Sequence, residues 1–240
     1  VGAAAEAAER VAAVAEAPAA AEAAALVVEA GPERLDAKRA LFDALLDAAP
    51  PPAPVATASS AMTVSEIVAA PERRARCLVA HPANPPTVIA LLELVPAPET
   101  APEAMDRAAA LFAGAGFSPV RLGREIPGFV MNRLQSAVLR EAYRLVAEGV
   151  ADVAGIDRVM RDALGPRWAL SGPFETAELN TPGGIVAHAA RLGPAYRAIG
   201  EGRGERDCLW PPELVAEVER QRRALTPADA LDARRAWRER

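Results

Sequence analysis

Cysteine, histidine, lysine and long apolar runs are all scarce in this chain of 240 residues. The two cysteines, Cys77 and Cys208, lie far apart and lack the spacing of metal ligands, so the sequence predicts neither a disulfide framework nor a bound metal. No apolar run reaches the roughly 18 residues of a membrane-spanning helix, and the start lacks the pattern of a signal peptide. We therefore expect no membrane contact and a cytoplasmic location.

Basic residues are also fewer than acidic ones, 27 against 32, for a net charge of -5. Because the two signs are mixed along the chain, no basic patch for nucleic acid is expected. All the basic residues but Lys38 are arginine. A single lysine in such a chain hints at a need for a compact ammonium there, although chance is the simpler explanation when this feature is taken alone.

Apolar content, at 51%, is ample for real cores, and its pattern in residues 1–125 is that of an α/β fold. After an alanine-rich start, short apolar segments that predict strands alternate with helical patterns. The predicted strands are 26–30, 55–57, 77–80, 88–95 and 118–122; the helices are 33–48, one opened by Thr63-Val64-Ser65-Glu66, and 102–114. This alternation predicts a largely parallel sheet, and hence an incomplete doubly wound (Rossmann-type) domain.

Residues 126–240 have a different pattern, with apolar residues at helical spacing and no strand signal. The helices predicted there are 127–149, 156–165, 185–192, 212–225 and 228–240, with Gly149 and Gly165 ending the first two. The sequence thus predicts an all-α helical domain after a boundary near Glu125.

Two ionisable residues in the first domain suggest chemistry. His81 closes an apolar strand, and strand ends in open α/β sheets are where ligands bind. Glu93 lies in the otherwise apolar segment 88–95, where a buried carboxylate needs a partner. If the prolines after His81 turn the chain back, Glu93 lies beside it and can orient the imidazole as a general base. The alternatives are a structural histidine in a proline-rich turn and an edge-strand glutamate facing water.

The segments His81-Pro82-Ala83-Asn84-Pro85-Pro86 and Leu92-Glu93-Leu94-Val95-Pro96 resemble the histidine and glutamate signatures of the 3-hydroxyacyl-CoA dehydrogenase superfamily. Further segments, including Arg167-Trp168-Ala169-Leu170 and Ala233-Arg234-Arg235-Ala236-Trp237-Arg238, are similar to its lambda-crystallin (L-gulonate 3-dehydrogenase) branch. The resemblance implies oxidation of a 3-hydroxyl to a ketone with NAD, on a hydroxy acid or a 3-hydroxyacyl-CoA. His81 takes the hydroxyl proton in that scheme, and Glu93 orients His81.

The same resemblance implies further site residues. Glu125-Ile126-Pro127-Gly128-Phe129-Val130-Met131-Asn132-Arg133 is similar to the family segment whose asparagine binds substrate, which implies that role for Asn132. Asn84 and Ser60 are implied to hold the reacting oxygen, with Ser59 as an alternative to Ser60. Glu33 and Lys38 match positions that contact NAD in relatives; as an alternative, both are solvated surface charges at a helix start.

One part of the family pattern is missing. Relatives carry a Gly-x-Gly-x-x-Gly turn that holds the pyrophosphate of the dinucleotide, whereas the first 30 residues here contain only Gly2. We therefore expect this chain to bind NAD weakly or not at all as it stands, unless the missing unit comes from elsewhere. The alternative to an enzyme is a catalytically inactive, truncated or structural (crystallin-like) homologue. The resemblance also implies a homodimer formed through the helical domain.

Overall fold

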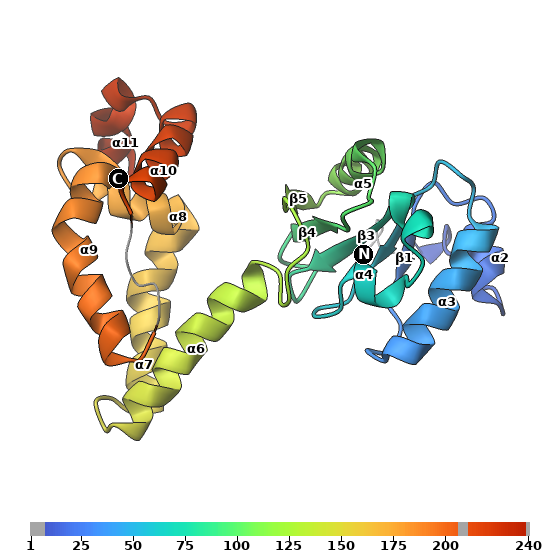
Figure 1. Cartoon of the computed structure of the whole chain (residues 1–240), viewed down its shortest axis with the longest axis horizontal. Coiled ribbons are helices and arrows are strands. Elements are labelled where there is room, and N and C mark those ends of the chain that lie inside the picture. The colour runs from blue at the N-terminus through green and yellow to red at the C-terminus, as the bar shows by residue number, and fades with distance from the viewer. Residues whose placement is uncertain (1–7, 206–210, 239–240) are drawn as a thin grey trace. The chain divides into compact units, whose positions relative to one another are not determined.

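The structure is a computed structural model that describes residues 8–205 and 211–238. The predictions for residues 1–7, for Cys208 and for the last two residues lie outside the described residues. The chain divides into two compact units, Val1–Arg140 and Glu141–Arg240, each treated below by itself (Figure 1). That division falls within a helix, while the last described strand ends at Arg121. A domain boundary near Glu125 stays a prediction.

The first unit is built on a five-stranded sheet in the order β1-β2-β3-β4-β5. The strands are β1 Val27–Glu29, β2 Val55–Thr57, β3 Cys77–Pro82, β4 Leu91–Pro96 and β5 Ser118–Arg121. The first three are parallel to one another, β4 is antiparallel to β3, and β5 is parallel to β4. The incomplete doubly wound α/β sheet predicted from the sequence is confirmed, with one antiparallel pairing.

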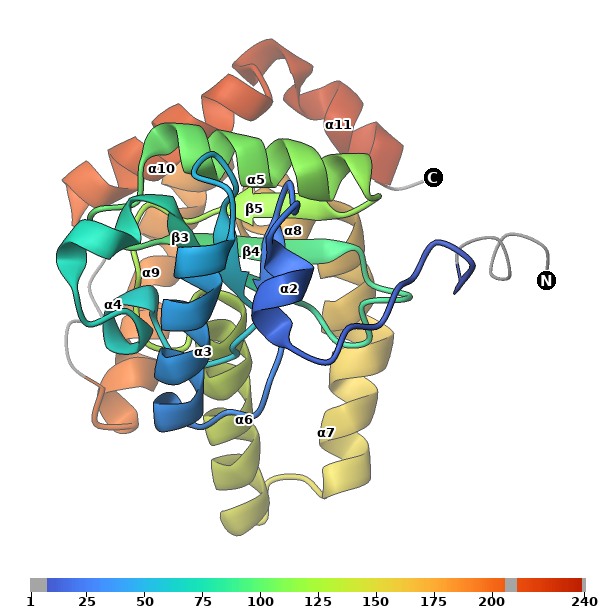
Figure 2. The ribbon, with the colours of Figure 1, turned by 90° about the vertical axis from the view of Figure 1, so that its right-hand side faces the viewer.

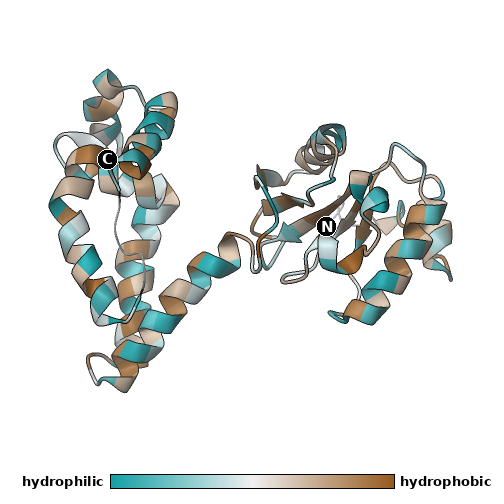
Figure 3. Cartoon of the chain, viewed as in Figure 1, coloured by the Kyte–Doolittle hydropathy of each residue, from teal (hydrophilic) through white to brown (hydrophobic). Residues whose placement is uncertain are grey.

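Helices cover both faces of this sheet. On one face lie α3 (Leu35–Ala48) and α4 (Val64–Ile67), on the other α5 (Pro102–Gly114), with α2 (Ala17–Ala21) beside α3 (Figures 1 and 2). Because side chains alternate along a strand, Val79 packs toward α3 and α4 while Leu78 packs toward α5. The central strands β2, β3 and β4 are mostly buried and largely hydrophobic (Figure 3), as expected where helices cover both faces of a sheet.

The strand predicted over 88–95 is shorter than expected. Val88 and Ile89 are 80% and 42% exposed and belong to the turn that follows Pro85-Pro86, so β4 begins only at Leu91. Periodicity cannot distinguish an apolar turn from an apolar strand. Helix α6 (Met131–Ala147) likewise begins later than Pro127, because Gly128 and Phe129 have positive φ angles that no α-helix accepts.

Every regular element that the structure describes in the second unit is helical, as predicted. This unit contains α7 (Val153–Val159), a π-helical turn (Met160–Leu164), α8 (Gly165–Leu179), α9 (Gly184–Gly202), α10 (Pro212–Leu225), a short 3-10 turn (Ala228–Ala230) and α11 (Leu231–Arg238). The prediction that Gly165 ends a helix is wrong. A Cβ at Gly165 would lie 2.8 Å from the Met160 carbonyl oxygen, so the glycine permits close backbone approach in a continuing helix. In the described ranges no helix is long and apolar enough to cross a membrane.

Candidate active site

His81 and Glu93 are brought together by the turn between β3 and β4. The two residues face each other across the antiparallel ladder, which places their side chains on the same face of the sheet. The His81 Nδ1 atom lies 2.9 Å from Glu93 Oε2, and the two side chains are 4% and 3% exposed. The predicted pairing is present in the structure, and the alternative of a glutamate facing water is excluded for Glu93.

The second carboxylate oxygen of Glu93 accepts hydrogen bonds from the start of α6. The main-chain amides of Val130 and Met131 both donate to Glu93 Oε1 at 2.9 Å. They reach it because the chain turns sharply through Gly128 (φ 77°) and Phe129 (φ 50°). Amides at a helix N-terminus have no intrahelical partner, so they are free to donate to Glu93 and hold its carboxylate in place.

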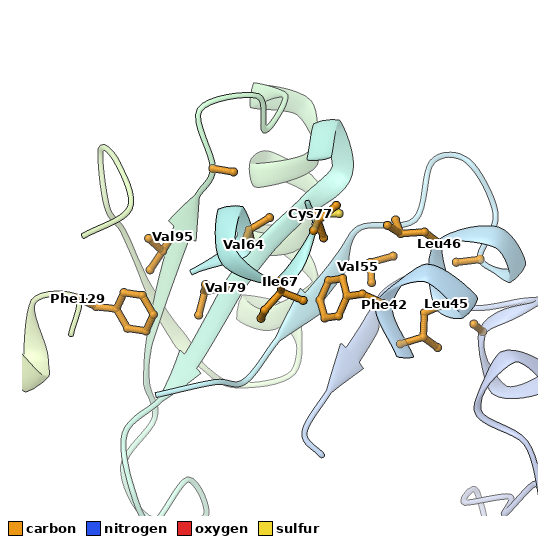
Figure 4. Packing of buried hydrophobic residues seen from close by; sticks show 14 residues of the cluster. Phe42, Leu45, Leu46, Val55, Val64, Ile67, Cys77, Val79, Val95 and Phe129 are labelled. Atoms are coloured by element: carbon orange, nitrogen blue, oxygen red, sulfur yellow. The ribbon is translucent and has the colours of Figure 1, made fainter. Parts of the chain in front are cut away.

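Phe129 closes the site from the side of α6. Its side chain is fully buried among residues of the α3-facing core, near Val95 in Figure 4, and its ring centroid lies 5.5 Å from that of His81. Since an ionised Glu93 accepts from Nδ1–H, the Nε2 atom of a neutral His81 is left with its lone pair. Among the described residues Nε2 makes no hydrogen bond, so its lone pair is available to a ligand, although the His81 side chain is only 4% exposed. This arrangement provides a general base.

The turn after β2 carries the two candidate serines, and they differ in their surroundings. Ser59 is buried; its hydroxyl donates to Glu33 Oε2 at 2.9 Å and accepts from the Met62 amide at 2.9 Å. Ser60 is exposed, and in the part of the chain that the structure describes only its main chain forms hydrogen bonds: its amide donates to Glu33 Oε1 at 2.9 Å. The geometry favours Ser60 over Ser59 as the serine available to a ligand.

The two predicted asparagines are placed differently. Asn132, in the first turn of α6, donates from Nδ2 to the Ser60 carbonyl oxygen at 2.8 Å. It follows Met131, whose amide contacts Glu93, so a short stretch of α6 connects the Ser60 turn with the His81–Glu93 pair. Asn84 is exposed three residues beyond His81, and among the described residues no hydrogen bond joins it to the pair.

Lys38, predicted to contact NAD, is buried and ion-paired. Its ammonium donates to both carboxylate oxygens of Glu29, at 3.0 and 2.9 Å, and to the Gly31 carbonyl oxygen at 3.3 Å; the residue is 1% exposed. The alternative of a solvated charge is wrong for Lys38, whereas the Glu33 side chain is 49% exposed. With three donors and three acceptors, the ammonium has no N–H left for a ligand, which favours a structural role over the predicted cofactor contact.

Sequence reasoning missed three members of the site. Glu29 follows an apolar run, as Glu93 does, and the rule that a buried carboxylate needs a partner would have paired it with the single lysine. Thr57, whose hydroxyl donates to Glu29 Oε2 at 2.7 Å, carries no signal of its own. The role of Phe129 depends on a positive φ angle. In the sequence only the preceding glycine, Gly128, indicates a turn at this point.

Comparison with known protein families identifies both parts of the chain. Residues 2–126 match the family described as 3-hydroxyacyl-CoA dehydrogenase, NAD binding domain. Residues 128–225 match 3-hydroxyacyl-CoA dehydrogenase, C-terminal domain. This chain therefore belongs to the 3-hydroxyacyl-CoA dehydrogenase family, whose cofactor is NAD.

Within that family the chain lies in the lambda-crystallin branch. It is 44% identical to the lambda-crystallin homolog of Bos taurus over 218 residues, 89% of this chain and 66% of that protein, so it spans about two thirds of this relative. It is also 44% identical to an L-carnitine dehydrogenase of Streptomyces griseus over 163 residues, 68% of this chain and 48% of that protein. A solved diketoreductase is 28% identical with a TM-score of 0.64, covering 85% of this chain and 76% of its own.

The residues present fit the family cofactor in part. Glu33 follows the carboxyl end of β1 and Ser60 that of β2, at the edge of a parallel sheet where dinucleotides bind, and both are accessible. Each oxygen of the half-exposed Glu33 carboxylate has a lone pair beyond the one it already uses, which suits a sugar hydroxyl. Lys38 does not fit as a direct contact, because its ammonium is enclosed.

Proposed function

We propose that this chain is an NAD-dependent oxidoreductase that oxidises the 3-hydroxyl of a hydroxy acid or a 3-hydroxyacyl-CoA to the ketone. The observation that carries the proposal is the buried pair of His81 and Glu93, in which Glu93 contacts Nδ1 of the imidazole and Nε2 makes no hydrogen bond among the described residues. The family membership and the relatives named as dehydrogenases support the reaction class.

The proposed chemistry assigns a separate task to each residue. Bound NAD would supply the acceptor for the hydride of the carbinol carbon. His81 takes the hydroxyl proton on Nε2, and the Glu93 carboxylate stabilises the imidazolium that results. Ser60, Asn84 and Asn132 supply hydrogen bonds to the substrate oxygen as its charge changes. Of the two residues predicted to contact the cofactor, Glu33 would hold a ribose hydroxyl.

Turnover with a panel of substrates tests this proposal. NADH formation is followed with L-gulonate, 3-hydroxybutyrate, 3-hydroxybutyryl-CoA and L-carnitine, for the native chain and for His81→Asn. We expect the substitution to lower kcat/KM by about 10²–10⁴-fold, the usual contribution of a general base. His188→Gln is the matched control, since it alters the other histidine of the chain, and it should retain full turnover at neutral pH.

Direct titration with NADH completes the test. Saturable binding supports a cofactor-using enzyme. Turnover of His81→Asn at the native rate would rule out His81 as the base. Absence of both NADH binding and turnover in the native chain would favour the alternative of an inactive or structural homologue.

A further inference from the structure

The side chains at the carboxyl ends of β1 and β2 form one continuous network of hydrogen bonds. It begins at Lys38, passes through Glu29 to the Thr57 hydroxyl, and continues to the amide of Ser59, which donates to Thr57 Oγ1 at 3.2 Å. From there Glu33 connects Ser59 with Ser60. The network ends where Asn132 donates to the Ser60 carbonyl oxygen. It therefore extends from a buried ion pair to Asn132, a half-buried residue of the candidate active site.

The buried end of this network is rigid for physical reasons. The side chains of Lys38 and Glu29 are 2% and 0% exposed, and Thr57 is fully buried. A buried ion pair contributes little net stability, but breaking it by removing one partner is costly, so the pair fixes geometry. Because Glu29 ends β1 and Thr57 ends β2, the ion pair fixes the starting point of the chain after each strand.

The exposed end has no comparable support of its own. Ser60 lies in a bend with no strand or helix to hold it, and its amide is held by Glu33 Oε1. Both oxygens of Glu33 are used on this one turn, which they approach from the start of α3. Removing the carboxylate leaves Ser60 restrained on this side only through its neighbours in the chain and through Asn132.

We propose that Glu33 is a positioning residue for Ser60 and Asn132. The buried side chains of Lys38, Glu29 and Thr57 in turn fix the position of the Ser60 turn. The proposal rests on the proposed function, since it gives Ser60 and Asn132 a substrate-binding role. Lys38 then influences the reaction without touching cofactor or substrate. The position of the Ser60 turn is set before any ligand binds.

The test uses the native chain without cofactor or substrate. Amide hydrogen exchange at Ser60 and the side-chain amide signals of Asn132 are measured by NMR in the native chain, Glu33→Gln and Thr57→Val. We expect Ser60 to exchange at least tenfold faster in both variants, and the Asn132 signals to shift. Val79, in the sheet core, should keep its protection, because the global fold is unchanged.

Thr100→Val is the matched control. Like Thr57, Thr100 both donates and accepts through its hydroxyl, to the Cys77 carbonyl oxygen at 2.6 Å and from the Ala97 amide at 2.8 Å, but it lies outside the network. A role in stability alone predicts equal effects of Thr57→Val and Thr100→Val on Ser60. Equal effects, or unchanged Ser60 exchange in Glu33→Gln, would overturn the proposal. If the expected exchange pattern is found but the native chain reduces no NAD with any substrate, the proposed function fails and the positioning role stands.

Discussion

Phe129 has a main-chain conformation that residues other than glycine seldom adopt. Its φ of 50° lies in the left-handed region, while its ring is fully buried. Both Phe129→Ala and Phe129→Gly remove the ring, at about 3–5 kcal/mol. Glycine adopts this conformation without the steric cost that alanine has, so we expect Phe129→Gly to be about 1 kcal/mol more stable than Phe129→Ala in urea unfolding.

Phe112 provides the control for that comparison. It is also buried but lies inside α5, where alanine is favoured over glycine by about 1 kcal/mol. The order of stability should therefore reverse, with Phe112→Ala above Phe112→Gly. The same order at both positions would contradict a strained turn at Phe129.

The thiol of Cys77 should be unreactive in the folded protein. Burial raises the pKa of its thiol to about 12, and the nearby arginines offset this only in part. Since the thiolate is the reactive species, a disulfide reagent at pH about 8 should label Cys77 only as the chain unfolds. Cys208→Ser isolates this thiol, and rapid labelling of the folded variant would contradict the account.

Single residues were predictable from sequence where burial forces a pairing. Glu93 in an apolar strand requires a partner, and His81 was the nearest suitable one, so the pair was predicted correctly. Lys38 was assigned to the cofactor by resemblance alone, and the structure shows its ammonium enclosed by Glu29. Phe129 depends on a dihedral angle that no residue pattern specifies.

At the scale of elements, the carbonyl oxygens at the end of α3 are bound by an arginine from a later part of the chain. The Arg76 guanidinium donates to the carbonyl oxygens of Leu46 at 2.6 Å and Pro50 at 2.6 Å, and also to those of Ala49 and Ala53. Carbonyls at a helix end lack intrahelical partners, and lysine cannot reproduce this planar fork. We expect Arg76→Lys to lower the free energy of unfolding by about 2 kcal/mol.

Arg107→Lys, in α5, is the control variant. Among the described residues Arg107 donates no hydrogen bond to carbonyl oxygens at a helix end, so the same substitution there removes none. Denaturant unfolding of both variants measures the difference. Equal stability of Arg76→Lys and the native chain would show that the contact does not hold the end of α3.

Elements were predictable where their signals are local. The cap at Thr63 is confirmed: the Thr63 hydroxyl accepts from the Glu66 amide, and the Glu66 carboxylate accepts from the Thr63 amide at 2.7 Å. Gly165 was misleading, since a glycine needed for close packing has the same sequence signature as a glycine that ends a helix. Sequence alone could not separate these two uses.

At the scale of the whole molecule, the second unit should lose stability as the pH falls. Burial lowers the pKa of His188 below 6.5, and the charge of Arg191 adds to this. The hydrogen bond from Arg234 is the main cause that lowers the pKa of Glu175 below 4.5. Both groups bind protons more readily in the unfolded chain, so their contributions are present at neutral pH. The His188 contribution is lost as the pH falls below about 6.5, and the Glu175 contribution below about 4.5.

Urea unfolding at about pH 7 and about pH 5.5 tests the histidine part of this prediction, because Glu175 remains ionised over that interval. The native chain should be less stable at the lower pH, and His188→Gln should show a smaller difference. An equal or larger difference in His188→Gln would exclude His188 as the source.

A homodimer through the helical unit remains a prediction, and exposed apolar side chains on α8 support it. Leu170 and Phe174, on either side of the kink at Gly172, are 53% and 58% exposed, and apolar surface of this kind can form a protein–protein contact. A charge placed on this surface should dissociate a dimer, so Leu170→Glu should halve the mass measured by light scattering. Ala216→Glu, an exposed position on α10, should leave the mass unchanged. A native chain of monomer mass would contradict the prediction.

The proposed reaction depends most on which ring nitrogen of His81 carries the proton. With Glu93 ionised and held by the amides of α6, neutral His81 must carry its proton on Nδ1 and leave Nε2 as the base. Nitrogen NMR of the labelled chain, at a pH where His81 is neutral, reads this tautomer directly, with His81→Asn to assign the signal. We predict the Nδ1–H form in the native chain and its loss in Glu93→Gln. An Nε2–H imidazole in the native chain would contradict the account, because no proton acceptor would then face the substrate.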